Sequence, residues 1–107
     1  MLTQLSRRDW ERFFARLSAA LAARSASIDT AGLDEELPGD RIDLLSTFYE
    51  PGSGELALLL EGDRRIVRHP REVHVHLDED LLRSMELVDA DGRRELVVLR
   101  RPLQVRA

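Results

Sequence analysis

The hydrophobic period of this 107-residue chain changes once, from the period of a helix to the period of strands. Between Arg7 and Arg24, large apolar side chains recur at steps of three and four residues, which places them on one stripe of an α-helix. That stripe consists of Trp10, Phe13, Phe14, Leu17 and Leu21. From residue 25 onward apolar and polar residues alternate, as in half-buried strands. The sequence therefore predicts one helix over residues 7–24, followed by strands alone.

Ser6 and Asp9 mark the start of this helix. A Ser at the N-cap with an acidic residue three positions later is the pattern of a capping box. Asp9 is shorter than the usual Glu, but the spacing is the same.

Turn and breaker residues divide the rest of the chain into short strands. Gly-containing turns follow residues 50 and 90, while Pro70 and Pro102 indicate a strand edge and a strand end. The predicted strands are residues 26–31, 41–50, 55–61, 64–68, 72–77, 84–89 and 94–101, with a polar loop over 32–40 and a tail over 103–107. Short turns favour antiparallel neighbours, so we expect one α+β domain. Its helix would pack on a curved antiparallel meander of about six strands, or on a partly closed barrel.

Two of the predicted strands are apolar on both faces, which is typical of central strands. In the strand 41–50, Ile42, Leu44 and Phe48 are expected on one face, and Leu45 and Tyr49 on the other. We therefore predict a partly apolar outer surface that a symmetric dimer would cover. Its expected members are Leu45, Tyr49, Ala57, Leu59, Val97 and Leu99.

The formal net charge of −4 conceals a strong segregation of charge along the chain. Residues 1–24 carry a net charge of +3, residues 25–63 carry −9, and residues 64–107 carry +2. All basic residues are Arg, and both Lys and Asn are absent, a pattern that codon bias in a GC-rich genome explains without any function. Segregated charge favours an acidic face that meets a basic face, within the fold or between subunits.

Several classes of function are excluded by what the sequence lacks. Without cysteine there are no disulfides, no thiolate catalysis and no Cys-based zinc site. No apolar stretch approaches the roughly 20 residues that span a bilayer. Asp9 and Glu11 argue against a mitochondrial presequence, and Arg12 and Arg16 interrupt any secretory apolar segment, so a cytoplasmic protein is expected.

Two histidines on one predicted strand are the best candidate ligands for a metal. His74 and His76 share the polar face of the strand 72–77, with acidic residues on either side. His and carboxylate side chains suit zinc or another divalent transition metal, but a closed site needs three or four ligands. His69 is the remaining candidate. The alternative is a polar face in contact with water, without any cofactor.

Four arginines within eight residues, Arg64, Arg65, Arg68 and Arg71, form a candidate contact for an anion or a partner. Nucleic acid is disfavoured because the chain is acidic overall and no aromatic residue for base stacking lies among these arginines. The alternatives are a protein partner, a second copy of the chain, or a solvated strand neutralised by the acidic residues 34–36.

Four segments together resemble a family of small bacterial domains of unknown function. These are Arg7-x-x-Trp10-x-x-Phe13-x-x-x-Leu17-Ser18, Leu37-Pro38 before a strand with Ile42, Arg68-His69-Pro70-Arg71-Glu72-Val73-x-Val75, and Met85-Glu86-Leu87-x-x-Ala90-Asp91-Gly92 followed by residues 96–100. The resemblance implies a cytoplasmic bacterial domain and brings no catalytic residues. No catalytic set is evident in the sequence itself. We therefore expect a non-enzymatic protein-interaction or self-association module, with a small-ligand or metal-binding domain on the His74/His76 face as the alternative.

Overall fold

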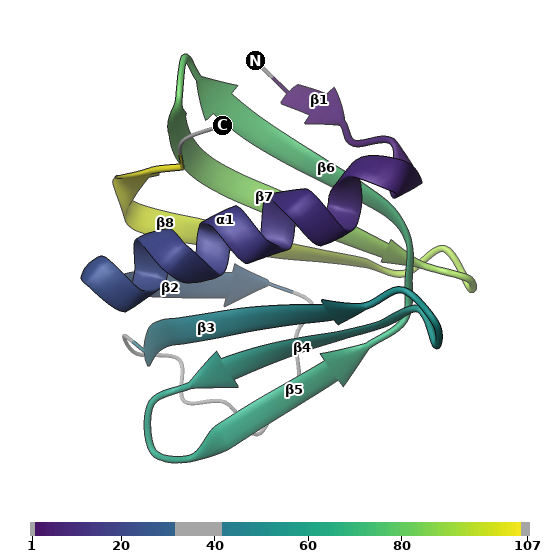
Figure 1. Cartoon of the computed structure of the whole chain (residues 1–107), viewed down its shortest axis with the longest axis horizontal. Helices are drawn as coiled ribbons and strands as arrows, with labels where there is room; N and C mark the ends of the chain where they lie inside the picture. The colour runs from purple at the N-terminus through teal and green to yellow at the C-terminus, as the bar shows by residue number, and fades with distance from the viewer. Residues whose placement is uncertain (1, 32–41, 106–107) are drawn as a thin grey trace.

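One α-helix and eight strands make up the part of the chain that the computed structural model describes, residues 2–31 and 42–105 (Figure 1). A 3-10 turn (Arg7–Asp9) leads into α1 (Trp10–Ala23). The strands are β1 (Leu2–Gln4), β2 (Ala26–Ala31), β3 (Ile42–Glu50), β4 (Glu55–Leu60), β5 (Arg64–Arg68), β6 (Pro70–Asp78), β7 (Leu81–Asp89) and β8 (Arg94–Gln104). All strand pairs are antiparallel, which confirms the predicted α+β class.

The sheet consists of two meanders placed side by side. Its strand order is β1-β6-β7-β8-β2-β3-β4-β5, so β2 joins the run β6–β8 to the run β3–β5. Only His69 separates β5, which is one edge of the sheet, from β6, which lies next to the other edge. So short a link is possible only because the sheet curls strongly on itself (Figure 1). The edge strands β1 and β5 do not pair in the described chain, so the sheet is strongly curled but does not close into a barrel.

Helix α1 crosses the hollow side of the curled sheet (Figure 1). Trp10, Phe14, Leu17 and Leu21 are buried in the core and Phe13 packs partly buried against it, which confirms the predicted stripe. The rings of Trp10 and Tyr49 meet edge to face, with centroids 5.5 Å apart. Burial of one large apolar side chain stabilises a fold by about 1.5–3 kcal/mol. The stripe therefore contributes much of what holds the helix to the sheet.

The start of the helix differs from the predicted capping box. Neither Ser6 nor Asp9 makes a side-chain cap, and the backbone N–H of Asp9 instead donates to the Ser6 carbonyl at 2.8 Å. Trp10 fixes the turn in their place. Its Nε1 donates to the Leu5 carbonyl at 3.2 Å, and the Arg7 guanidinium lies 4.9 Å from its ring centroid. Such a cation–π contact further stabilises the turn.

Alongside the second half of β3, α1 takes the place of a neighbouring strand. β2 pairs with β3 only up to Leu44, so the next residues have β4 on one side and no strand on the other. The Ser18 hydroxyl donates to the Thr47 carbonyl at 2.8 Å and accepts from the Thr47 N–H at 3.1 Å. Thr47 Oγ1 in turn donates to the Phe14 carbonyl at 3.0 Å. The helix thus satisfies backbone groups that would otherwise belong to an open strand edge.

A β-bulge in β3 reverses the predicted faces of its second half. The register with β4 shifts between Leu44 and Ser46, so one extra residue enters β3. As a result Phe48, predicted to face the core, is 58% exposed, while Tyr49, predicted to face outward, is only 6% exposed. A one-residue shift moves every later side chain to the opposite face. The prediction was therefore wrong from the bulge onward.

The predicted outer surface is wrong for half of its members. Leu45 and Leu59 are exposed, and Ala57 shares the outer face with Leu59 although it has little contact with solvent, but Tyr49, Val97 and Leu99 are buried in the core. On β8 the outward residues are Leu96 and Val98. The outer face is therefore apolar at only some of the positions that the sequence predicted.

Several strand boundaries also differ from prediction. β1, short and exposed, was not predicted, and it pairs with β6 through Thr3 and Val75. β6 begins at Pro70 and β7 already at Leu81. β8 continues past Pro102 to Gln104, so residues 103–105 are not a tail, and the side chains of Leu103 and Val105 are buried. The predicted loop 32–40, with Leu37-Pro38 and the acidic residues 34–36, lies outside the described residues.

Candidate functional site

The histidines predicted as metal ligands are each next to a different carboxylate. His74 Nε2 donates to Glu72 Oε1 at 3.0 Å, and His76 Nε2 lies 3.9 Å from Asp78 Oδ1. His69 lies between β5 and β6, with its Nε2 3.9 Å from Glu55 Oε2. His74 and His76 thus share one face of β6, as predicted, but His69 pairs with β4. Within residues 2–31 and 42–105, no group of three or more His or acidic side chains is arranged to hold a metal ion.

A hydrogen bond joins His74 to Glu72 on this face of β6. The hydrogen bond from His74 is the largest effect and holds the pKa of Glu72 below its ordinary value. Desolvation, the second largest effect, opposes this shift, and the charge of Arg71 lowers the pKa by a smaller amount. Register places His74 opposite Gln4 of β1 and Glu86 of β7. Glu86 accepts a hydrogen bond from Arg94 at 2.6 Å. The face is thus a network of paired polar groups.

The four clustered arginines do not form one patch. Arg65 pairs with Glu55 at 3.6 Å on the outer face, and Arg71 pairs with Glu72 at 3.5 Å. Arg64 is exposed at the start of β5. Arg68 points to the inside of the curl, because it alternates with Arg65 and Val67 along the strand. Although these four arginines are close in the sequence, they do not form a single anion-binding surface.

Arg68 instead makes an ion pair between the two halves of the sheet. Its Nε lies 2.8 and 2.9 Å from the two carboxylate oxygens of Glu95, and the exposed fractions of the two side chains are 28% and 11%. Arg68 also donates to the Val67 carbonyl at 3.0 Å. The pair links β5 with β8, which are far apart in strand order. Glu95 gave no signal in the sequence, because its partner lies on the edge strand β5, four strands away from β8 in the sheet.

An apolar surface is present on the outer side of β3, β4 and β5. Phe48 lies opposite Ala57, Ala57 lies opposite Val67, and Leu59 follows Ala57 by two residues on the same face. These four residues form what we call the β3–β4 patch. Phe48 and Leu59 are 58% and 40% exposed, so two large side chains of the patch remain in contact with solvent. The other exposed apolar side chains lie elsewhere: Leu45 at the bulge, Leu2, Leu81, Leu96 and Val98.

A narrow hollow of about 130 Å³ borders this patch at the open edge of β3. It is lined by Glu11 and Ala15 of α1 and by residues 47–51. Phe48 belongs to both the hollow and the patch. The β3–β4 patch therefore continues around the strand edge toward the helix.

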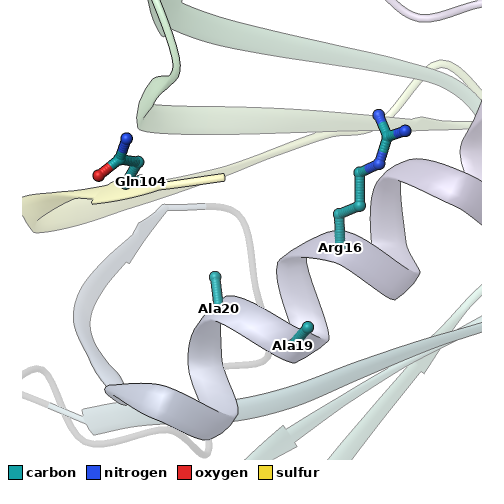
Figure 2. Close-up of a pocket in the computed structure, with 4 residues that line it drawn as sticks. All are labelled: Arg16, Ala19, Ala20 and Gln104. Carbon is teal, nitrogen blue, oxygen red and sulfur yellow. The ribbon is translucent and has the colours of Figure 1, made fainter. Parts of the chain in front are cut away.

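Figure 2 shows a second hollow, of about 310 Å³, between α1 and the end of β8. Arg16 extends from the helix on one side and Gln104 lies across from it on β8. Ala19 and Ala20 leave the space between them open because their side chains are small. Among the described residues, the polar side chains that line this hollow are those of Arg16 and Gln104.

The described structure defines a small α+β domain, with one helix packed on an eight-stranded antiparallel sheet. No described helix is long and apolar enough to span a membrane. Over residues 1–107 the chain matches DUF5335, a family of unknown function, and it belongs to that family. The predicted resemblance to a family of small domains of unknown function is thereby confirmed.

One relative is an uncharacterised protein of Aquifex aeolicus (strain VF5), which is 25% identical to the chain over 99 residues. The match covers 87% of this chain and 86% of that protein. No solved structure matches the chain.

Proposed function

We propose that this domain is a non-enzymatic protein-interaction module that self-associates through the β3–β4 patch. The observation that carries the proposal is the exposure of Phe48, at 58%, next to the exposed Leu59 on the same face. Removing a Phe side chain from water is worth about 1.5–3 kcal/mol. An aromatic residue held outward beside other apolar residues is typical of an interface centre.

The charges around the patch suit a second copy of the same chain. Arg65 and Glu55 lie on the outer face with the patch, and their side chains are 59% and 37% exposed. In a two-fold contact each surface meets itself, so Arg65 of one copy can pair with Glu55 of the other. A rim of one charge sign would repel its copy, whereas this mixed rim is self-complementary.

Sedimentation equilibrium over a wide range of protein concentration tests this proposal. We expect a monomer–dimer equilibrium, weakened at least tenfold by Phe48→Ser and clearly weakened by Leu59→Ser. The matched control is Leu81→Ser, because Leu81 is 39% exposed, almost as Leu59 is at 40%, but lies at the start of β7.

Two results would overturn the proposal. One is a chain that sediments as a monomer at every concentration up to the millimolar range. The other is an equal effect of Leu59→Ser and Leu81→Ser, because self-association would then depend on general surface hydrophobicity. Circular dichroism of each variant verifies that the comparison is between folded proteins.

A further inference from the structure

A separate hollow of about 460 Å³ lies where α1 ends, β2 begins and β8 bends. Its volume falls within the roughly 300–1,000 Å³ of typical small-molecule sites. The polar side chains that line it come from three distant segments: Arg24, Ser25, Ser27, Asp43, Arg100 and Arg101. None of these residues belongs to the β3–β4 patch, so this site is independent of the function proposed above.

Two of the three guanidinium groups are held in place by the protein itself. Arg24 Nη2 donates to the Pro102 carbonyl at 2.9 Å, and Arg100 Nη2 donates to Asp29 Oδ1 at 2.7 Å. A guanidinium carries five N–H donors, so one such bond leaves most of its donors for a ligand. Fixing the side chain beforehand lowers the entropy lost on binding.

The charge balance of the hollow is opposite to that of the whole chain. Among the described residues that line the hollow, three arginines stand against one carboxylate, Asp43, which gives a balance of two positive charges. Asp29, which pairs with Arg100, and Glu61, which accepts from the Asp43 N–H at 3.0 Å, lie beside the hollow. The chain as a whole carries −4. The nearby C-terminal end of α1 adds only about half a negative charge, which the arginines outweigh.

The serine hydroxyls add polar groups that fit an oxyanion ligand. Ser25 Oγ donates to Asp43 Oδ2 at 3.3 Å, a long contact that a stronger acceptor could replace. Ser27 Oγ is buried, and in the described part of the chain it has no hydrogen-bond partner. Because this atom is closed to solvent, a ligand in the hollow would reach it only if the wall shifted, so recognition of an anion rests on the arginines and Ser25.

We propose that this hollow binds a small molecule through a phosphate group, with Arg24, Arg100 and Arg101 as its main ligands. Arginine recognises phosphate through paired N–H groups, and several arginines can surround one tetrahedral anion. Nucleic acid fits less well, because the chain is acidic and no aromatic side chain for base stacking lines the hollow.

Titration with inorganic phosphate and pyrophosphate tests the proposal on the intact chain. At constant ionic strength with chloride, we expect a saturable shift of the backbone amide resonances of residues 25–27 and 100–101, and a higher melting temperature. Arg101→Ala should weaken binding about tenfold or more, since a hydrogen bond to a charged group contributes about that much.

Two further variants make the test specific. Arg93→Ala removes the same charge just before β8, at the end opposite Arg100 and Arg101, and should leave the affinity unchanged. Asp43→Asn should tighten binding severalfold, because it removes a negative charge while its amide oxygen can still accept from Ser25.

Three outcomes would overturn the proposal. The first is no saturable shift with either phosphate probe, and the second is equal affinity of the Arg101→Ala and Arg93→Ala variants. The third is salt-sensitive binding of a single-stranded oligonucleotide that pyrophosphate does not displace, which would assign these arginines to nucleic acid.

Discussion

Replacing Ser18 with Ala sets two physical effects against each other. Ala is the better helix former by about 0.5 kcal/mol, so helix propensity alone predicts a more stable protein. Ser18, however, bonds to both backbone groups of Thr47, and Ser46 Oγ lies 3.0 Å from its hydroxyl. The single hydroxyl hydrogen of Ser18 is given to the Thr47 carbonyl, so Ser46 donates to Ser18.

The contacts let the size of the loss be estimated. An unpaired buried polar group costs about 1–3 kcal/mol, and partial access of water places the two groups of Thr47 near the lower limit. With about 0.5 kcal/mol for the lost bond from Ser46, and the gain in helix propensity subtracted, the net loss is about 2 kcal/mol. For a chain of 107 residues this lowers the melting temperature by about 9 °C.

Urea unfolding followed by fluorescence of the single tryptophan measures this loss, because Trp10 is buried in the core. The control is Ala22→Ser on the exposed side of α1, which changes helix propensity alone and should cost only about 0.5 kcal/mol. If Ser18→Ala is as stable as the wild type or more so, then helix α1 does not act as the neighbour of β3.

Three other predictions follow from the polar contacts. Arg68→Ala leaves Glu95 unpaired and nearly buried, so it should destabilise the protein by about 2–4 kcal/mol in urea, while the double replacement of Arg68 and Glu95 by Met should recover most of that loss. The lowered pKa of Glu72 contributes stability above the unfolded pKa of about 4.5 that is lost as the pH falls through the lower folded pKa, so Glu72→Gln should flatten the stability profile below pH 5. Equimolar zinc should leave the melting temperature unchanged, since no third ligand joins His74 and His76 in the described structure; a rise would instead favour the metal-binding alternative.

The elements of this fold could be predicted because each depends on a local pattern. The stripe from Trp10 to Leu21 faces the core as its spacing requires, and Val73 and Val75 are buried while His74 between them is not. Turn residues also fixed the hairpins, as in Gly92, whose φ of +82° suits glycine. Patterns of this kind predict an element correctly in any fold that keeps one face of that element buried.

Most of the two proposed binding surfaces could not be predicted, although Ala57 and Leu59 were expected on the outer face, because these surfaces depend on contacts between distant segments. The Arg68–Glu95 pair and the arginine-lined hollow each bring together residues from separate strands, and no local spacing specifies such a meeting. Pro102 was read as a strand end. Instead β8 bends there: four residues of β8 lie between the partners of Leu82 and Ser84 on β7, where regular pairing leaves one. That bend carries Arg100 and Arg101 to the hollow.

The bulge after Leu44 connects three features that otherwise look separate. It turns Phe48 outward, and it lies where β3 parts from β2. Thr47 therefore has β4 on one side and no described strand on the other, where Ser18 of α1 bonds to it. The same bulge therefore accounts for the β3–β4 patch, the open edge of β3 and the hydrogen bonds between Ser18 and Thr47. A change at Ser18 disturbs the backbone next to Phe48, so its effect on self-association would not separate stability from binding. Replacements of outward-facing side chains, such as Phe48→Ser, leave the hydrogen bonds between Ser18 and Thr47 intact. These variants are therefore the ones that should decide the interaction hypothesis.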